Sequence, residues 1–73
     1  MPKASVKTIF GTALRSLREE RGYSQEHLAE RAGLHRNYVG GVERGERNIA
    51  LENIVKLAQA LSVRAKDLFD ALP

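Results

Sequence analysis

The apolar residues of the chain recur at helical spacing, in short runs that are separated by glycines. Phe10, Leu14 and Leu17 fall at positions i, i+4 and i+7, which places them on one face of a helix. Glycine readily adopts the left-handed backbone conformation that ends a helix, so a glycine between two runs predicts a stop. Those stops stand at Gly22, Gly33 and Gly45. No segment alternates at period two, and the sequence therefore predicts an all-α fold without strands.

Five helices are expected from this pattern. Ser24 is a good N-cap for the second helix, whereas Ala50 and Arg64 are poor N-caps for the fourth and fifth, whose first turns should fray more easily. Residues 1–5 are expected to form a flexible tail. The expected helices span residues 6–21, 25–31, 36–44, 51–61 and 66–72.

The short chain limits the size of the core and the means of stabilising it. With 73 residues and no cysteine, residues 1–73 are expected to form a single domain that helix packing holds together, with or without a partner subunit. No apolar run approaches the roughly 20 residues that span a bilayer, and the N-terminus MPKASVK lacks the apolar centre of a signal peptide. A cytoplasmic protein that does not associate with membranes is expected.

Charge is distributed unevenly along the chain, although the net charge is only +3. Residues 1–18 carry four cations and no acid, and residues 19–30 carry four glutamates and one arginine. Residues 31–48 carry four arginines and two glutamates. Two basic zones that flank an acidic one favour opposed faces, of which one suits a polyanion.

The expected third helix lies in the segment HRNYVGGVERGER and contains two adjacent glycines. Each glycine is less favourable in a helix than alanine by roughly 1 kcal/mol, so the pair requires a physical reason. On a helical wheel Val39 and Val42 face inward with Tyr38 beside them. A bare backbone on the opposite side could approach DNA closely within a major groove about 12 Å wide, or could let the helix cross a neighbour closely. That outward side holds Arg36, Asn37, Gly40, Gly41 and Arg44.

Two side chains at the start of this helix have the chemistry of base recognition. The guanidinium of Arg36 can donate two hydrogen bonds to O6 and N7 of guanine, and the amide of Asn37 can pair with N6 and N7 of adenine. Both lie one turn before the glycine pair. The sequence therefore predicts that this helix reads bases in the major groove.

The segment SQEHLAERAGLHRNYVGGVERGERNIALENIVKLAQAL resembles the helix-turn-helix domains of phage repressors and of the related Xre-type bacterial regulators. The resemblance covers roughly residues 6–70, with the helix-turn-helix core at about 24–45, and RNYVGGVERGERNIALENI looks most like the controller proteins of restriction-modification systems. It implies a compact five-helix repressor-like fold. It also implies a sequence-specific transcriptional regulator that binds palindromic operators in double-stranded DNA as a homodimer, and that controls a restriction-modification system by activation and repression.

The resemblance implies roles for individual residues. Gln25 would bond a phosphate and brace the third helix, with the Ser24 hydroxyl close to the same phosphate. The start of the third helix would supply base contacts, and its end and the following loop would contact the DNA backbone. Gly41 stands where relatives often carry a reading side chain, so base readout would fall on fewer residues. The base contacts would come from His35, Arg36, Asn37 and Tyr38, and further backbone contacts from Arg44, Arg47 and Asn48.

Two pairs of charged residues have implied roles outside DNA recognition. In the family, the residues that correspond to Arg18 and Glu43 form a partly buried ion pair between the first and third helices. Glu26 and Glu30 lie one turn apart on the second helix, on a surface that touches the sigma factor of RNA polymerase in activating members. Alternatively, Glu26 complements the positive end of the helix dipole and Glu30 is solvated.

A homodimer is also expected from the symmetry of DNA. One such domain reads about half a site, and two domains related by a two-fold axis reach successive major grooves about 34 Å apart. The last helix is more apolar than a small core needs, and Phe69 can be explained by core packing alone. The expected subunit contact involves Val63, Leu68 and Leu72.

Catalysis, metals and cofactors are not expected. His27 and His35 have no metal-ligand spacing around them, and no nucleophile with a base and an orienting group can be assembled. His35 could serve as a weak helix cap or touch a phosphate, and no small-molecule effector is indicated. A second hypothesis is a protein-interaction module, such as an antitoxin-like partner binder, which the basic third helix disfavours.

Overall fold

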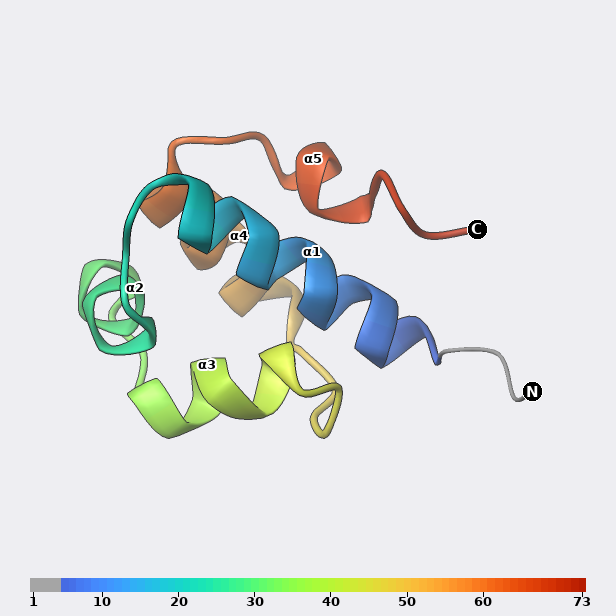
Figure 1. Ribbon diagram of the computed structural model, residues 1–73, viewed down its shortest axis with the longest axis horizontal. Helices are drawn as coiled ribbons and strands as arrows, with labels where there is room; N and C mark the ends of the chain where they lie inside the picture. The colour runs from blue at the N-terminus through green and yellow to red at the C-terminus, as the bar shows by residue number, and fades with distance from the viewer. Residues whose placement is uncertain (1–4) are drawn as a thin grey trace.

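The computed structural model describes residues 5–73 and places five helices and no strand in that range (Figure 1). The expected all-α fold is confirmed. The first four helices agree with the expected bounds within one residue, but the last is shorter because Leu72 N–H bonds the Phe69 carbonyl at 2.9 Å and closes a turn. The helices are α1 (Val6–Glu20), α2 (Gln25–Ala32), α3 (Arg36–Glu43), α4 (Leu51–Leu61) and α5 (Ala65–Phe69).

Helix α1 runs through the middle of the molecule and organises the others (Figure 1). It packs against α3 on one side and α5 on another, while α2 packs against both α3 and α4. None of the described helices is long and apolar enough to cross a membrane.

Ser5 has a defined role at the start of α1. Ser5 is the N-cap of α1, and its hydroxyl accepts a hydrogen bond from Thr8 N–H at 3.1 Å. The expectation of a flexible tail over residues 1–5 is therefore wrong at Ser5, and residues 1–4 lie outside the described residues. The cap satisfies one of the backbone donors that every helix leaves free at its start.

The core contradicts part of the expected subunit contact. Leu68 is fully buried within its own chain, together with Leu14 and Leu61, so it has no surface to offer a second subunit. Its neighbour Phe69 is 38% exposed and lies with its ring 5.7 Å from that of Phe10. Leu68, and not Phe69, is thus the fully buried member of this pair, because the short α5 turns Leu68 toward the core.

Helices α4 and α5 begin without a capping side chain at the N-cap position, as the residues Ala50 and Arg64 predict. In α5 the missing cap is partly replaced from within the helix, because the Asp67 carboxylate accepts a hydrogen bond from Arg64 N–H at 3.0 Å. This reciprocal bond is half of a capping box. Greater fraying therefore remains a prediction mainly for the start of α4.

A glycine in α1 permits the close crossing of α1 and α3. A Cβ atom on Gly11 would lie 2.3 Å from the carbonyl oxygen of Val42 and 2.5 Å from that of Glu43. Both obstacles are backbone atoms, which cannot rotate away. The close helix crossing that the sequence attributed to glycines in α3 is thus made by Gly11 of α1.

Replacement of Gly11 by alanine should destabilise the fold by about 1–3 kcal/mol, even though alanine is the better helix former. For a domain of this size the melting temperature should fall by on the order of 10 °C, as measured by circular dichroism. Ser16→Ala, on the exposed side of the same helix, is the control and should change stability by less than about 0.5 kcal/mol. A Gly11→Ala protein as stable as the parent would show that α1 and α3 are not in backbone contact.

Candidate nucleic-acid interface

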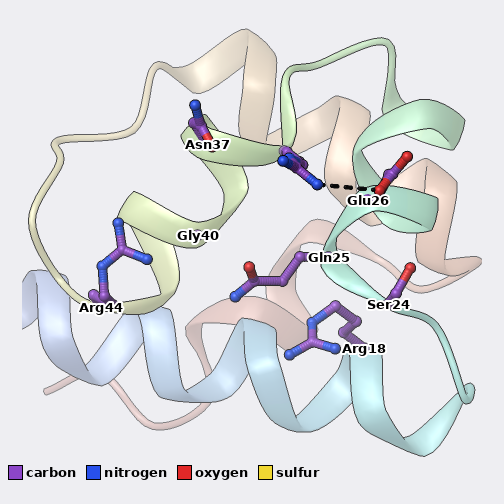
Figure 2. Close-up of a pocket in the computed structure, with 8 residues that line it drawn as sticks. Arg18, Ser24, Gln25, Glu26, Asn37, Gly40 and Arg44 are labelled. Carbon is purple, nitrogen blue, oxygen red and sulfur yellow. Dashed lines mark hydrogen bonds and ion pairs between the residues drawn. The ribbon is translucent and has the colours of Figure 1, made fainter.

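A cleft between the start of α2 and the exposed side of α3 gathers most of the residues expected to bind DNA (Figure 2). The connection before it is tight because Gly33 adopts a left-handed conformation (φ 71°) and Leu34 N–H bonds the Ala29 carbonyl at 2.8 Å. Helix α3 then begins at once, with its N-cap at His35. The cleft is lined by Arg18, Ser24, Gln25, Glu26, Arg36, Asn37, Gly40 and Arg44.

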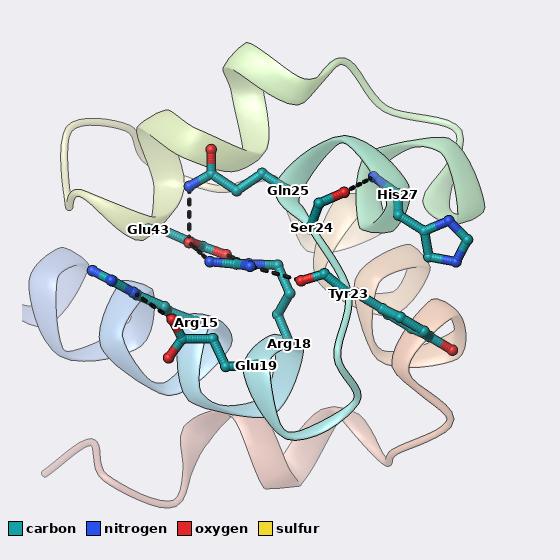
Figure 3. Close-up of polar contacts among 8 residues, drawn as sticks. All are labelled: Arg15, Arg18, Glu19, Tyr23, Ser24, Gln25, His27 and Glu43. Carbon is teal, nitrogen blue, oxygen red and sulfur yellow. Dashed lines mark hydrogen bonds and ion pairs between the residues drawn. The ribbon is translucent and has the colours of Figure 1, made fainter.

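The floor of this region is a buried ion pair (Figure 3). Arg18 Nε and Nη2 donate to the two carboxylate oxygens of Glu43, at 2.7 and 3.0 Å, and Arg18 Nη1 donates to the Tyr23 carbonyl at 2.7 Å. The hydrogen bond to Glu43 raises the pKa of Arg18 against the opposing effect of burial. The ion pair that the resemblance implied between the first and third helices is therefore present.

Gln25 links this pair to the cleft. Its Nε2 donates to Glu43 Oε1 at 3.0 Å, and because a carboxylate only accepts hydrogen bonds, the amide nitrogen must face Glu43 (Figure 3). The second hydrogen of that nitrogen remains available to an acceptor in the cleft. The structure thus shows Gln25 bracing α3, as the resemblance implied, while its phosphate contact remains a prediction.

The glycine pair of α3 does not form the open surface that the helical wheel indicated. Both glycines are buried, and a Cβ on Gly40 would lie 3.2 Å from Gln25 Oε1 and 3.0 Å from Arg44 Nη1. A Cβ on Gly41 would lie 3.1 Å from the side chain of Arg47. The wheel is wrong here because it ignores long side chains that fold back over the helix. The glycines make room for three of the side chains expected to contact the DNA backbone.

The start of α3 is exposed and its backbone is capped. The His35 ring accepts a hydrogen bond at Nδ1 from Asn37 N–H at 3.0 Å, so His35 serves as the helix cap that the sequence suggested. Arg36 and Asn37 are exposed and line the cleft. Arg36 Nη1 lies 3.3 Å from Glu26 Oε2, which the sequence did not predict. The phosphate contact of His35 remains a prediction.

Tyr38 is less available than its neighbours at the start of α3. Its side chain is half-buried, and its hydroxyl accepts a hydrogen bond from Asn53 Nδ2 of α4 at 3.0 Å. The guanidinium of Arg47 lies over its ring, 5.5 Å from the centroid. Tyr38 therefore ties α3 to α4 and supports Arg47, and any base contact would use only the exposed part of its ring.

The expected backbone contacts fall into two groups. Arg44 lines the cleft with Ser24 and Gln25, and its Nε lies 3.0 Å from Glu46 Oε2, which raises the pKa of Arg44. Arg47 and Asn48 instead line a separate, more apolar hollow between the start of α1 and α5.

The two acidic residues expected to face RNA polymerase both line a second hollow beside the start of α3, and only one of them also lines the cleft. Glu26 lies in the cleft, paired with Arg36, whereas Glu30 does not line it. The ion pairs of Glu26 with Arg36 and of Glu46 with Arg44 are contacts that the sequence did not predict. Among residues 5–73 no group of three histidine or acidic side chains is placed to hold a metal ion.

Two short helices joined by a tight turn, with the start of the second helix exposed, define a helix-turn-helix DNA-binding domain. A family model described as helix-turn-helix matches residues 14–68 of the chain. The control protein C.BamHI of Bacillus amyloliquefaciens is 43% identical over 67 residues, which cover 90% of this chain and 83% of that protein. The chain therefore belongs to the Xre-type helix-turn-helix family and is a DNA-binding transcriptional regulator.

Solved structures agree with this assignment. The crystal structure of the restriction-modification controller protein C.AhdI from Aeromonas hydrophila matches with a TM-score of 0.86 and 56% identity, over 86% of this chain and 96% of that one. SinR, a master regulator for biofilm formation whose crystal structure was determined in complex with DNA, matches with a TM-score of 0.80 and 32% identity. That match covers 84% of this chain and 98% of the other. The expected similarity to controller proteins is confirmed.

Loss of Arg18 should be far more damaging than loss of an exposed arginine on the same helix. Arg18→Met leaves Glu43 buried without its partner and should cost about 3–5 kcal/mol in urea unfolding. Arg15 forms an exposed i, i+4 pair with Glu19, so Arg15→Met should cost no more than about 0.5 kcal/mol. Equal stability of the two variants would show that the buried pair does not hold α1 against α3.

Proposed function

We propose that the chain binds palindromic operator DNA as a homodimer, with α3 in the major groove. The observation that carries this proposal is the cleft at the start of α2 and α3, where donors from three helices converge beside the exposed polar side chains of Arg36 and Asn37. An eight-residue helix such as α3 is about 12 Å long, close to the width of the groove.

Each part of this surface has a role in the proposed complex. Arg36 and Asn37 read base edges, and His35 lies beside them at the start of the helix. Ser24 and Gln25 hold a phosphate at the start of α2, where the helix dipole also favours an anion. Contacts with the flanking DNA backbone come from Arg44, Arg47 and Asn48. One subunit thus contacts the DNA backbone on both sides of the groove.

Substitution of a base-reading residue should have a different effect from substitution of a phosphate-binding one. Two DNA probes are compared. The selected duplex is one that the unchanged protein selects from a random library, and the shuffled duplex has the same base composition in a different order. Arg36→Ala should weaken binding to the selected duplex by about 1–3 kcal/mol and affect the shuffled duplex far less. Arg47→Ala should weaken both similarly and reduce the salt slope. Equal losses on both duplexes for Arg36→Ala would contradict the base-reading role.

The exposed face of α4 is the best candidate for the subunit contact. Leu51 and Val55 lie one turn apart and are 74% and 42% exposed, so they form an apolar patch on the surface of α4. Helix α4 is the next helix after α3 in the chain, so a two-fold axis beside its first turns would place the two α3 helices on one side of the dimer. Val63 already packs against the core, and we assign it and Leu72 to the edge of this contact.

Introduction of a charge on this face should separate the subunits. The unchanged protein should sediment as a dimer at micromolar concentration, and Leu51→Glu should sediment as the 8.1 kDa monomer. Ser16→Glu, on the exposed side of α1, is the control and should remain a dimer. A monomeric unchanged protein would contradict the dimer, and loss of the dimer only in Ser16→Glu would place the contact elsewhere.

We also propose that the chain controls a restriction-modification system in the cytoplasm, by binding rather than by catalysis. Genes for a methyltransferase and an endonuclease beside its own would support this, and their absence from the neighbourhood would count against it. Contact with the sigma factor would involve Glu30 more than Glu26, because Glu26 is engaged by Arg36. A Glu30→Lys protein that binds DNA normally and activates a reporter as the unchanged protein does would contradict that contact.

A further inference from the structure

An acid stands in the cleft where the proposed function places phosphates. Among the described residues that line this cleft, Glu26 is the only carboxylate. It lies in the first turn of α2, beside the expected phosphate ligands Ser24 and Gln25. Its Oε2 is 3.3 Å from Nη1 of Arg36, the proposed guanine reader. A carboxylate here repels DNA, so its placement requires a reason other than affinity.

The ion pair between Arg36 and Glu26 is weak enough for DNA to displace. The side chains of Arg36 and Glu26 are 64% and 71% exposed, and exposed pairs contribute little to stability because water screens them and ordering two long side chains costs entropy. A bidentate bond of arginine to guanine is stronger, since it has two directional hydrogen bonds in a site from which water is largely excluded. A phosphate at the edge of the groove can also accept two hydrogen bonds, but it stays exposed to water and salt, which screen the contact.

We infer that Glu26 is a specificity-determining residue, which competes with DNA for the side chain of Arg36. This inference rests on the proposed function. On operator DNA, guanine displaces the carboxylate and Arg36 reads its base. On other DNA, no guanine lies in register with Arg36 and only screened phosphates are within reach, so Arg36 stays with Glu26 and contributes no phosphate contact. Glu26 therefore weakens non-specific binding more than specific binding.

The pair between Arg44 and Glu46 makes a useful contrast. It has a similar geometry, with 3.0 Å between Nε and Oε2, and both side chains are more than half exposed. Arg44, however, is proposed to bind a phosphate, which every DNA sequence offers. Release of Arg44 should therefore increase affinity for all sequences alike, whereas release of Arg36 should change the discrimination between them.

The test compares Glu26→Gln with Glu30→Gln and Glu46→Gln in the full chain, by fluorescence anisotropy on the selected and shuffled duplexes without polymerase. Glu26→Gln should bind the shuffled duplex roughly fivefold more tightly, and the selected duplex less than about twofold more tightly. Its salt slope on the shuffled duplex should steepen by about 0.9 per subunit, one additional phosphate contact. Glu30→Gln removes the same charge from the same helix and controls for net charge, and Glu46→Gln should strengthen binding to both duplexes equally.

A second measurement isolates the competition for Arg36. In the Arg36→Ala background, Glu26→Gln should increase affinity for the shuffled duplex no more than Glu30→Gln does. A gain that persists there, or a Glu26→Gln protein that matches Glu30→Gln in every respect, would overturn the inference while leaving the proposed function intact. If the unchanged protein does not distinguish any selected duplex from its shuffled form, the proposed function fails and the inference fails with it.

Discussion

The bidentate pair between Arg18 and Glu43 sets the geometry on which the rest of the structure depends. Burial of two charges is costly, and the cost is offset only when further hydrogen bonds satisfy both groups. Here the Tyr23 carbonyl accepts from the arginine and the Gln25 amide donates to the carboxylate. The pair thereby joins α1, α2 and α3 at one point. Because Gln25 also lines the cleft, a phosphate bound there would rest on a residue fixed by the buried pair.

This arrangement explains how so short a helix can carry the recognition surface. A helix of eight residues is not stable alone, since nucleation costs more than the few hydrogen bonds return. Helix α3 is held instead by Val39, Val42 and Glu43, all on its inner side. The exposed residues at the start of α3 take no part in core packing, so they can present polar groups to a ligand. Two of the exposed arginines on this surface, Arg36 and Arg44, are each held by a glutamate, so the surface is less cationic than its sequence suggests.

The parts of the fold that depend on local chemistry could be predicted from the sequence. Ser24 and the left-handed Gly22, Gly33 and Gly45 mark helix boundaries because capping and positive φ act within a few residues. In α5 the sequence placed Leu68 in the subunit contact, and this failed. The helix is too short for its periodicity to decide which of Leu68 and Phe69 faces the core. The packing of α3 against α1 depends on Gly11, whose role appears only once the two helices are placed together.

The residues of the candidate site could be predicted from the sequence, but the contacts among their side chains could not. The resemblance identified Gln25, Arg36 and Asn37, and the structure places all three in one cleft. The sequence could not show that long side chains cover the glycine pair. A helical wheel gives the direction of each residue from the axis of one helix, and it omits side chains that reach over from other segments. The contact of Arg36 with Glu26 spans ten positions in the chain, and it depends on the angle between two helices that no local pattern encodes.

Recognition of DNA by this protein depends on entry of the exposed start of α3 into the major groove. Methylation interference on the selected duplex tests it most directly, because dimethyl sulfate modifies N7 of guanine in the major groove and N3 of adenine in the minor groove. If α3 enters the groove, N7 methylation should block binding at two positions, one in each half-site, about one helical turn apart. Interference confined to adenine N3, with no effect of guanine N7 methylation, would contradict it.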